Sequence, residues 1–226
     1  MNLSIFALLG AAAIGLSLGL LGSGGSILTV PVLVYLVGQE EKIAIAGSLF
    51  VVGSIAVLGT IPYLRQKLVD WKTVWMFGIP GMAGTYIGAW LSVLLSGVMQ
   101  LAIFAFVMFA ASYFMLKPQK DLKSDHPGER HVIKIVIDGL VVGILTGVVG
   151  VGGGFLIVPA LVLLGGLSMR VAVASSLMII ALKSYSGFVK YLDVLNEAGK
   201  SLDWTVLTIM IALGGAGTLF GNHIAN

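Results

Sequence analysis

The sequence predicts an all-α polytopic membrane protein with about seven transmembrane helices in two duplicated halves. Three observations predict this fold. The chain is very apolar, its apolar stretches are long enough to cross a bilayer, and one glycine-rich phrase occurs twice. Each half is expected to contain a glycine-rich helix break followed by a short half-helix.

Composition indicates the class of protein. The chain has 226 residues, of which 58% are hydrophobic and 10% are charged, and its mean hydropathy is +1.05. A typical soluble domain is about a quarter charged. The net charge of +3 fits membrane topology better than nucleic-acid binding. The sequence contains no cysteine, which excludes disulfides, thiolate metal sites and cysteine nucleophiles.

Apolar stretches follow one another along nearly the whole chain. A transmembrane helix needs about 20 apolar residues, and the stretches 26–37 and 154–165 are too short to span. We expect these two to be half-helices. The expected full spans are 3–22, 42–64, 73–95, 97–116, 132–149, 168–190 and 204–224.

Basic residues predict the sidedness of the loops. Lys and Arg gather in the loop 65–72 and in the hydrophilic linker 117–131, whereas the loop 38–42 is net acidic. The positive-inside rule therefore predicts a cytoplasmic linker and places loop 38–42 outside. If 3–22 spans fully, the N-terminus is also cytoplasmic. The expected location is the cell membrane (inner or plasma membrane), with several passes.

The glycine-rich phrase reveals an internal duplication. Residues 19–31 read GLLGSGGSILTVP, and residues 147–159, 128 positions later, read GVVGVGGGFLIVP. Several features recur in the same order in both halves, which indicates duplication. The expected division is a first repeat over 1–116, a linker over 117–131, and a second repeat over 132–226 that lacks its last helix.

The sequence leaves the orientation of the repeats open. Four crossings per repeat would make the two copies parallel, and a re-entrant first segment would make them inverted. The charged loops fit the parallel arrangement slightly better.

Glycines at membrane depth have two interpretations. Backbone leaves the helix inside a bilayer only where it is buried in protein or lines a cavity. A half-helix that begins there aims its free N–H groups and the positive end of its dipole at one point, which is typical of an anion site. The alternative is close helix packing, which we favour for Gly81, Gly84 and Gly88 and their counterparts Gly214, Gly217 and Gly221. The expected substrate-binding residues are Gly22, Ser23, Gly24, Gly25, Ser26, Gly150, Gly152, Gly153, Gly154, Ser48, Ser176 and Lys183.

Two charged residues, Lys183 and Asp138, lie inside expected spans. Lys183, whose repeat counterpart is Ile55, either contacts the anion or extends its flexible stem to the membrane surface. Asp138 either couples transport to protons or, as we favour, pairs with Lys134 at the interface. His126, His131 and His223 lack the spacing of metal ligands, so no metal and no cofactor are expected.

The two glycine phrases, the A-x-S-L that follows each, and the paired VDW and LDW resemble the sulfite exporter TauE/SafE family, also called the toluene-sulfonate uptake permeases. The resemblance covers nearly the whole chain. It implies seven or eight spans and secondary transport of sulfur-containing anions such as sulfite, thiosulfate, sulfonates or sulfoacetate.

The expected function is therefore that of a secondary transporter of such an anion, bound at the paired glycine breaks, and not that of an enzyme. No nucleotide-binding P-loop is present in the sequence, which speaks against a primary pump. The alternatives are a non-transporting membrane subunit and, less favoured, an intramembrane enzyme. The expected partners are a small anionic substrate and the lipid bilayer. Self-association into a homo-oligomer is left open, and binding of nucleic acid is not expected.

Overall fold

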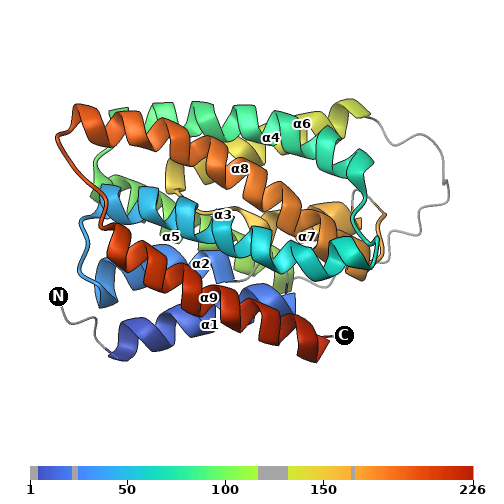
Figure 1. Ribbon diagram of the computed structural model, residues 1–226. Helices are drawn as coiled ribbons and strands as arrows, with labels where there is room; N and C mark the ends of the chain where they lie inside the picture. The colour runs from blue at the N-terminus through green and yellow to red at the C-terminus, as the bar shows by residue number, and fades with distance from the viewer. Residues whose placement is uncertain (1–4, 22–24, 117–131, 164–165, 226) are drawn as a thin grey trace.

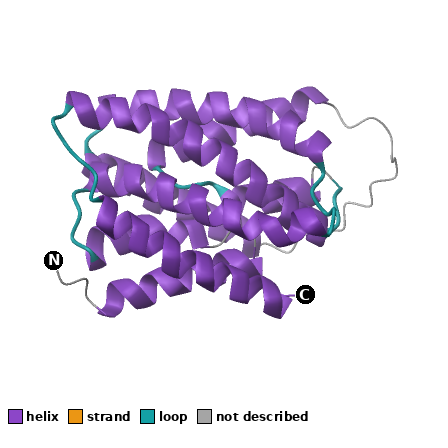
Figure 2. Cartoon of the chain, viewed as in Figure 1, coloured by secondary structure: helices purple, strands orange, loops and turns teal. Residues whose placement is uncertain are grey.

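The computed structural model describes residues 5–21, 25–116, 132–163 and 166–225 (Figure 1). All regular secondary structure within these ranges is helical (Figure 2). The helices are α1 (Ile5–Leu21), α2 (Gly25–Pro31), η1 (Val32–Leu36), α3 (Glu41–Arg65), α4 (Trp71–Leu91), η2 (Ser92–Leu94), α5 (Gly97–Leu116), α6 (Val132–Val149), α7 (Gly154–Leu163), α8 (Met169–Glu197) and α9 (Trp204–Ala225).

The helix lengths fit an all-α polytopic membrane protein, but among the described residues fewer helices than the seven predicted spans are long and apolar enough for a full crossing. Among the described residues, α3, α4, α8 and α9 are long and apolar enough to cross a bilayer, and α1, α5 and α6 are shorter apolar helices. The two predicted half-helices are confirmed as α2 and α7, which have 7 and 10 residues. After Pro31, whose ring nitrogen has no hydrogen to donate, α2 continues as the π-helix η1. The linker 117–131 lies outside the described residues, so its cytoplasmic side stays a prediction.

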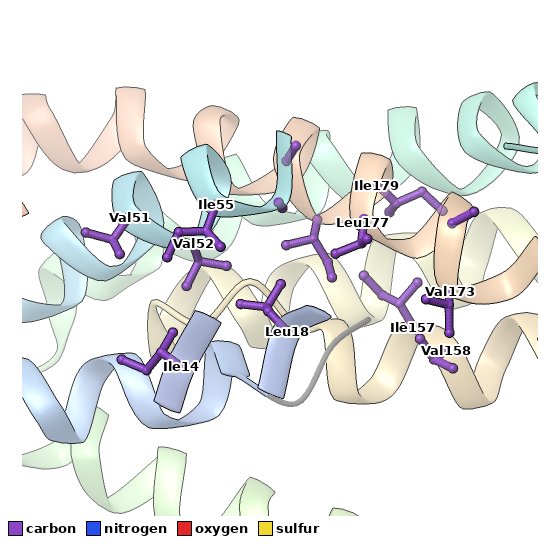
Figure 3. Packing of buried hydrophobic residues seen from close by; sticks show 14 of the residues in the cluster. Ile14, Leu18, Val51, Val52, Ile55, Ile157, Val158, Val173, Leu177 and Ile179 are labelled. Atoms are coloured by element: carbon purple, nitrogen blue, oxygen red, sulfur yellow. The ribbon is translucent and has the colours of Figure 1, made fainter. Parts of the chain in front are cut away.

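The long helices pack in a symmetrical order. The central pair is α3 and α8; α4 packs on α8 and α9 packs on α3. The outer helices are α6, which packs on α4, and α1, which packs on α9 (Figure 1). Apolar side chains of α1, α3, α7 and α8 fill the space between them, as Figure 3 shows for Leu18, Ile55, Ile157 and Leu177.

Glycines bring the outer helices into backbone contact. A Cβ atom placed on Gly84 would lie 2.3 Å from the Leu140 carbonyl oxygen, and one on Gly217 would lie 2.8 Å from the Ala12 carbonyl oxygen. Side chains at these positions would force the helices apart. The predicted packing role is confirmed at these glycines and at Gly88 and Gly221. Gly81 and Gly214 instead face side chains of the central helices.

The first helix forms a hairpin with the half-helix that follows it. A Cβ atom on Gly10 would contact Val32 and Leu36, and one on Gly25 would contact Ile14 and Leu18. The start of α1 therefore lies at the same end of the molecule as the loop 38–40. This contradicts the expectation that the N-terminal end of the first helix lies opposite that loop. Because α1 and α2 form a hairpin, the start of α1 and the end of η1 lie at the same end of the molecule.

The two repeats are inverted. Glu40 forms an ion pair with Lys200, which places the α8–α9 loop at the same end as the loop 38–40. The helix α3, about 37 Å long at 1.5 Å per residue, separates that end from the α3–α4 loop, where the Asp70 N–H donates to Ser175 Oγ. The α3–α4 and α8–α9 loops are repeat counterparts, yet they lie at opposite ends (Figure 1). The parallel arrangement, slightly favoured from loop charges, is wrong.

Candidate anion site at the second glycine break

The second glycine phrase interrupts the helix, as predicted. The helix α6 ends at Val149 and α7 begins at Gly154. Gly150 and Gly153 have φ angles of +74° and +70°, in the left-handed region that side chains with a Cβ atom rarely adopt. The glycines are therefore required by the backbone at this break.

Side chains satisfy the carbonyl groups at the break. Ser48 of α3 donates to the Gly150 carbonyl oxygen, and Gln100 of α5 donates to the Val148 carbonyl oxygen at 2.7 Å. The hydroxyl of Tyr191 lies 3.2 Å from the same Val148 oxygen. Carbonyls at a helix C-terminus lack intrahelical partners, and these three side chains supply them. The carbonyl oxygens of Val148 and Gly150 are thus occupied.

Hydrogen-bond donors gather on the other side of the break. The first N–H groups of α7 have no intrahelical acceptor, and the helix dipole adds positive potential there. The Lys183 ammonium nitrogen lies 3.4 Å from where a Cβ atom on Gly153 would stand, and Ser184 Oγ lies 3.1 Å from such an atom on Gly152. Both Lys183 Nζ and Ser184 Oγ are buried and have no hydrogen-bond partner within the described chain.

Lys183 does not extend to the membrane surface. The residue is only 1% exposed, and its stem fills the gap at Gly81, where a Cβ atom would lie 2.8 Å from Lys183 Cδ. Between described residues, the ion pairs are Lys190 with Asp193 and Lys200 with Glu40. The Lys183 ammonium is thus held beside the break with no carboxylate paired to it.

The two halves of the molecule differ at this position. Lys183 corresponds to Ile55, and a Cβ atom on Gly214, the counterpart of Gly81, would lie 2.3 Å from Ile55 Cδ1. Figure 3 shows Ile55 among the core side chains. Leu18 and Ala56 stand where the second half has Thr146 and Ser184. The polar set therefore belongs to one half.

The other predicted site residues are divided between the halves. Gly152, Gly153, Gly154 and Lys183 come together, with Ser48 and Gly150 alongside. Gly25 and Ser26 are buried on α2 and Ser176 is buried on α8, away from this set, and Gly22, Ser23 and Gly24 lie outside the described residues.

Several contributors were missed as members of one site. Thr146, whose Cγ2 would lie 2.2 Å from a Cβ atom on Gly153, Gln100, Tyr191 and Gly81 were not among the predicted residues. A comparison of side-chain polarity between the two repeats would have singled out Thr146 beside Lys183.

Asp138 also carries a buried oxygen. Its Oδ2 atom has no hydrogen-bond partner among the residues described, and the side chain of Lys134, its predicted partner, lies outside them. Asp138 precedes Thr146 by eight residues on α6, about 12 Å along the helix axis. About two helical turns therefore separate Asp138 from Thr146.

Comparisons with known proteins identify the family of this chain. The family model described as sulfite exporter TauE/SafE matches residues 7–226. A probable membrane transporter protein of Xylella fastidiosa is 33% identical over 224 residues, covering 94% of this chain and 82% of the relative. The probable membrane transporter protein YunE of Bacillus subtilis is 32% identical over 216 residues, covering 85% and 79%. No solved structure matches the chain. With its apolar helices and its match over almost the full length, the chain belongs to the TauE/SafE family of membrane transporters.

Proposed function

We propose that this transporter carries a small sulfur-containing anion, such as sulfite, thiosulfate or a sulfonate, and binds it at the second glycine break. The family description names a sulfite exporter, which supports the substrate class. The observation that carries the proposal is the Lys183 ammonium, buried without a partner beside Gly153. A buried charge is costly unless it is paired, and an anion would supply the missing partner.

The binding mode follows from the donors at the break. The anion would accept hydrogen bonds from Lys183, from the Ser184 hydroxyl and from the first N–H groups of α7. Charge-assisted hydrogen bonds of this kind are about twice as strong as neutral ones. Ser48 would act indirectly, because it holds the Gly150 carbonyl oxygen away from the anion.

The first break takes a smaller part in this proposal. Its Gly22, Ser23 and Gly24 remain predicted ligands, but Ile55 and Leu18 stand where Lys183 and Thr146 stand in the second half. The first half therefore offers no amine at the position equivalent to Lys183. We therefore centre the site on residues 150–154 and Lys183 rather than on two equal breaks.

Transport into liposomes containing the purified protein tests this function. Uptake of labelled sulfite, thiosulfate and a short alkanesulfonate should be saturable for at least one of them. Lys183→Met should raise the apparent KM about 10- to 100-fold, because a hydrogen bond to a charged group contributes about 1.5–3 kcal/mol. Lys190→Met is the matched control, since Lys190 lies on the same helix in an ion pair with Asp193. Equal KM values in both variants would exclude Lys183 as an anion ligand.

A glycine substitution tests the backbone part of the site. Gly153→Ala should abolish uptake, because its Cβ atom would meet Thr146 and its φ angle is +70°. Gly199→Ala is the control for backbone strain alone, since Gly199 has a φ angle of +65° and nothing within 4 Å of its Cβ position. Uptake lost to the same degree in both variants would mean that strain, rather than the site, explains the loss.

A further inference from the structure

The structure shows a closed state of the Lys183 site. Lys183 is 1% exposed, so its ammonium is out of reach of water from both faces of the molecule. A transporter that works by alternating access must pass through such a closed state each time the site changes sides. The energy of this state, with and without an anion, therefore sets how fast each crossing occurs.

An empty site makes the closed state unfavourable. Lys183 Nζ has no hydrogen-bond partner in the described part of the chain. An unpaired buried amine costs free energy whether it keeps its charge or gives up its proton to become neutral. Ser184 Oγ beside it is neutral and also unpartnered. A bound anion would pair with Lys183 and accept a hydrogen bond from Ser184. The closed state is therefore lower in free energy with the anion than without it.

Within the described ranges, no carboxylate forms an ion pair with Lys183. The carboxylates of Asp193 and Glu40 are paired with Lys190 and Lys200. Asp138 lies about 12 Å from Thr146 along α6, and α6 is fixed to α4 by glycine contacts such as that of Gly84 with Leu140. The first half offers Ile55 at the equivalent position.

We propose that the protein is an anion exchanger: the loaded site crosses the membrane in both directions, and the empty site returns too slowly to complete a cycle. The counter-substrate belongs to the same chemical class as the substrate, a small oxyanion that fits against Lys183. This inference rests on the proposed function and adds the mode of transport to it. No covalent step is involved.

Efflux from liposomes tests the exchange. Vesicles loaded with labelled thiosulfate are diluted into buffer with or without unlabelled thiosulfate. Potassium and valinomycin hold the membrane potential at zero, so that charge movement does not limit efflux. We expect efflux into thiosulfate-free buffer to be at least about tenfold slower, which corresponds to a barrier higher by about 1.4 kcal/mol. Lys190→Met should keep this ratio.

Two results would overturn the inference. Equal efflux with and without external thiosulfate would mean that the empty site returns freely. Efflux into thiosulfate-free buffer that a pH gradient accelerates to the exchange rate would mean that proton movement, not a counter-anion, resets Lys183. Failure of the proposed function has a different signature, in which neither thiosulfate nor sulfite nor an alkanesulfonate is moved under any of these conditions.

Discussion

Lys183→Met should make the anion-free protein more stable. The substitution removes a buried ammonium that has no partner among the described residues, and it keeps an unbranched apolar side chain in the gap beside Gly81. Replacing even a buried ion pair with apolar residues of similar volume is often neutral or stabilising by about 1–4 kcal/mol, and Lys183 has no ion-pair partner to lose among the described residues. A change of 1 kcal/mol shifts the Tm of a chain of this length by about 2–4 °C, so we expect a rise of at least about 2 °C.

Thermal unfolding in detergent, with and without thiosulfate, measures this change. A ligand at a hundredfold excess over its Kd adds about 2.7 kcal/mol to the stability of the folded state. The original protein should gain that stabilisation, and Lys183→Met should gain little. With the anion present, the difference between the two Tm values should therefore shrink or change sign. Lys190→Met should respond as the original protein does. A lower Tm for Lys183→Met without anion would refute the reasoning, because it would require a stabilising partner for the ammonium.

Three further predictions concern the scaffold. Gly81→Ala should weaken anion binding with little loss of stability, because its Cβ atom would displace the Lys183 stem; Gly84→Ala should do the opposite, with about 1–3 kcal/mol lost, since its Cβ atom would meet backbone. Binding by calorimetry and Tm measure the two effects. Ser48→Ala should lower the free energy of unfolding by about 1–3 kcal/mol, because it leaves the buried Gly150 carbonyl unsatisfied. Denaturant unfolding measures this change, and an unchanged free energy of unfolding would contradict it. Gln66→Cys and Ser201→Cys should react with an impermeant maleimide from opposite faces of the membrane, whereas labelling from one face would contradict inverted repeats.

The second glycine break could be predicted because glycine has a specific physical use there. Gly150 and Gly153 need positive φ angles, which only glycine adopts readily, and such residues leave a recognisable run in the sequence. Helix ends were predicted less well. The helix α8 continues to Glu197, beyond the apolar stretch expected to end at 190, because hydropathy marks the membrane and not the last turn of a helix.

The orientation of the repeats could not be predicted from the sequence. The helix α1 has 17 residues, close to the length of a full span, and its apolar composition is the same whether it crosses or returns as a hairpin. The decisive facts are contacts between distant residues, such as Gly10 with Leu36 and Glu40 with Lys200. A repeated motif carries no information on these pairings.

The position of Lys183 depended on a residue far away in the sequence. A lysine in a span either extends to the surface or stays inside, and its own helix does not decide between them. Lys183 stays inside because Gly81 on α4 has no side chain and leaves room for the buried lysine stem. Its counterpart Gly214 does the same for Ile55, so each half keeps the same gap and fills it differently.

This difference at equivalent positions has a consequence for the transport cycle. Inversion of the repeats lets the two halves exchange their roles as the site opens to either side, which requires similar packing in both. The glycine contacts of α4 with α6 and of α1 with α9 preserve that similarity. Lys183 places an amine at this position in one half, and Ile55 places an apolar side chain at the equivalent position in the other. The scaffold can therefore be symmetrical while the anion that we propose at Lys183 supplies the balancing charge during the crossing.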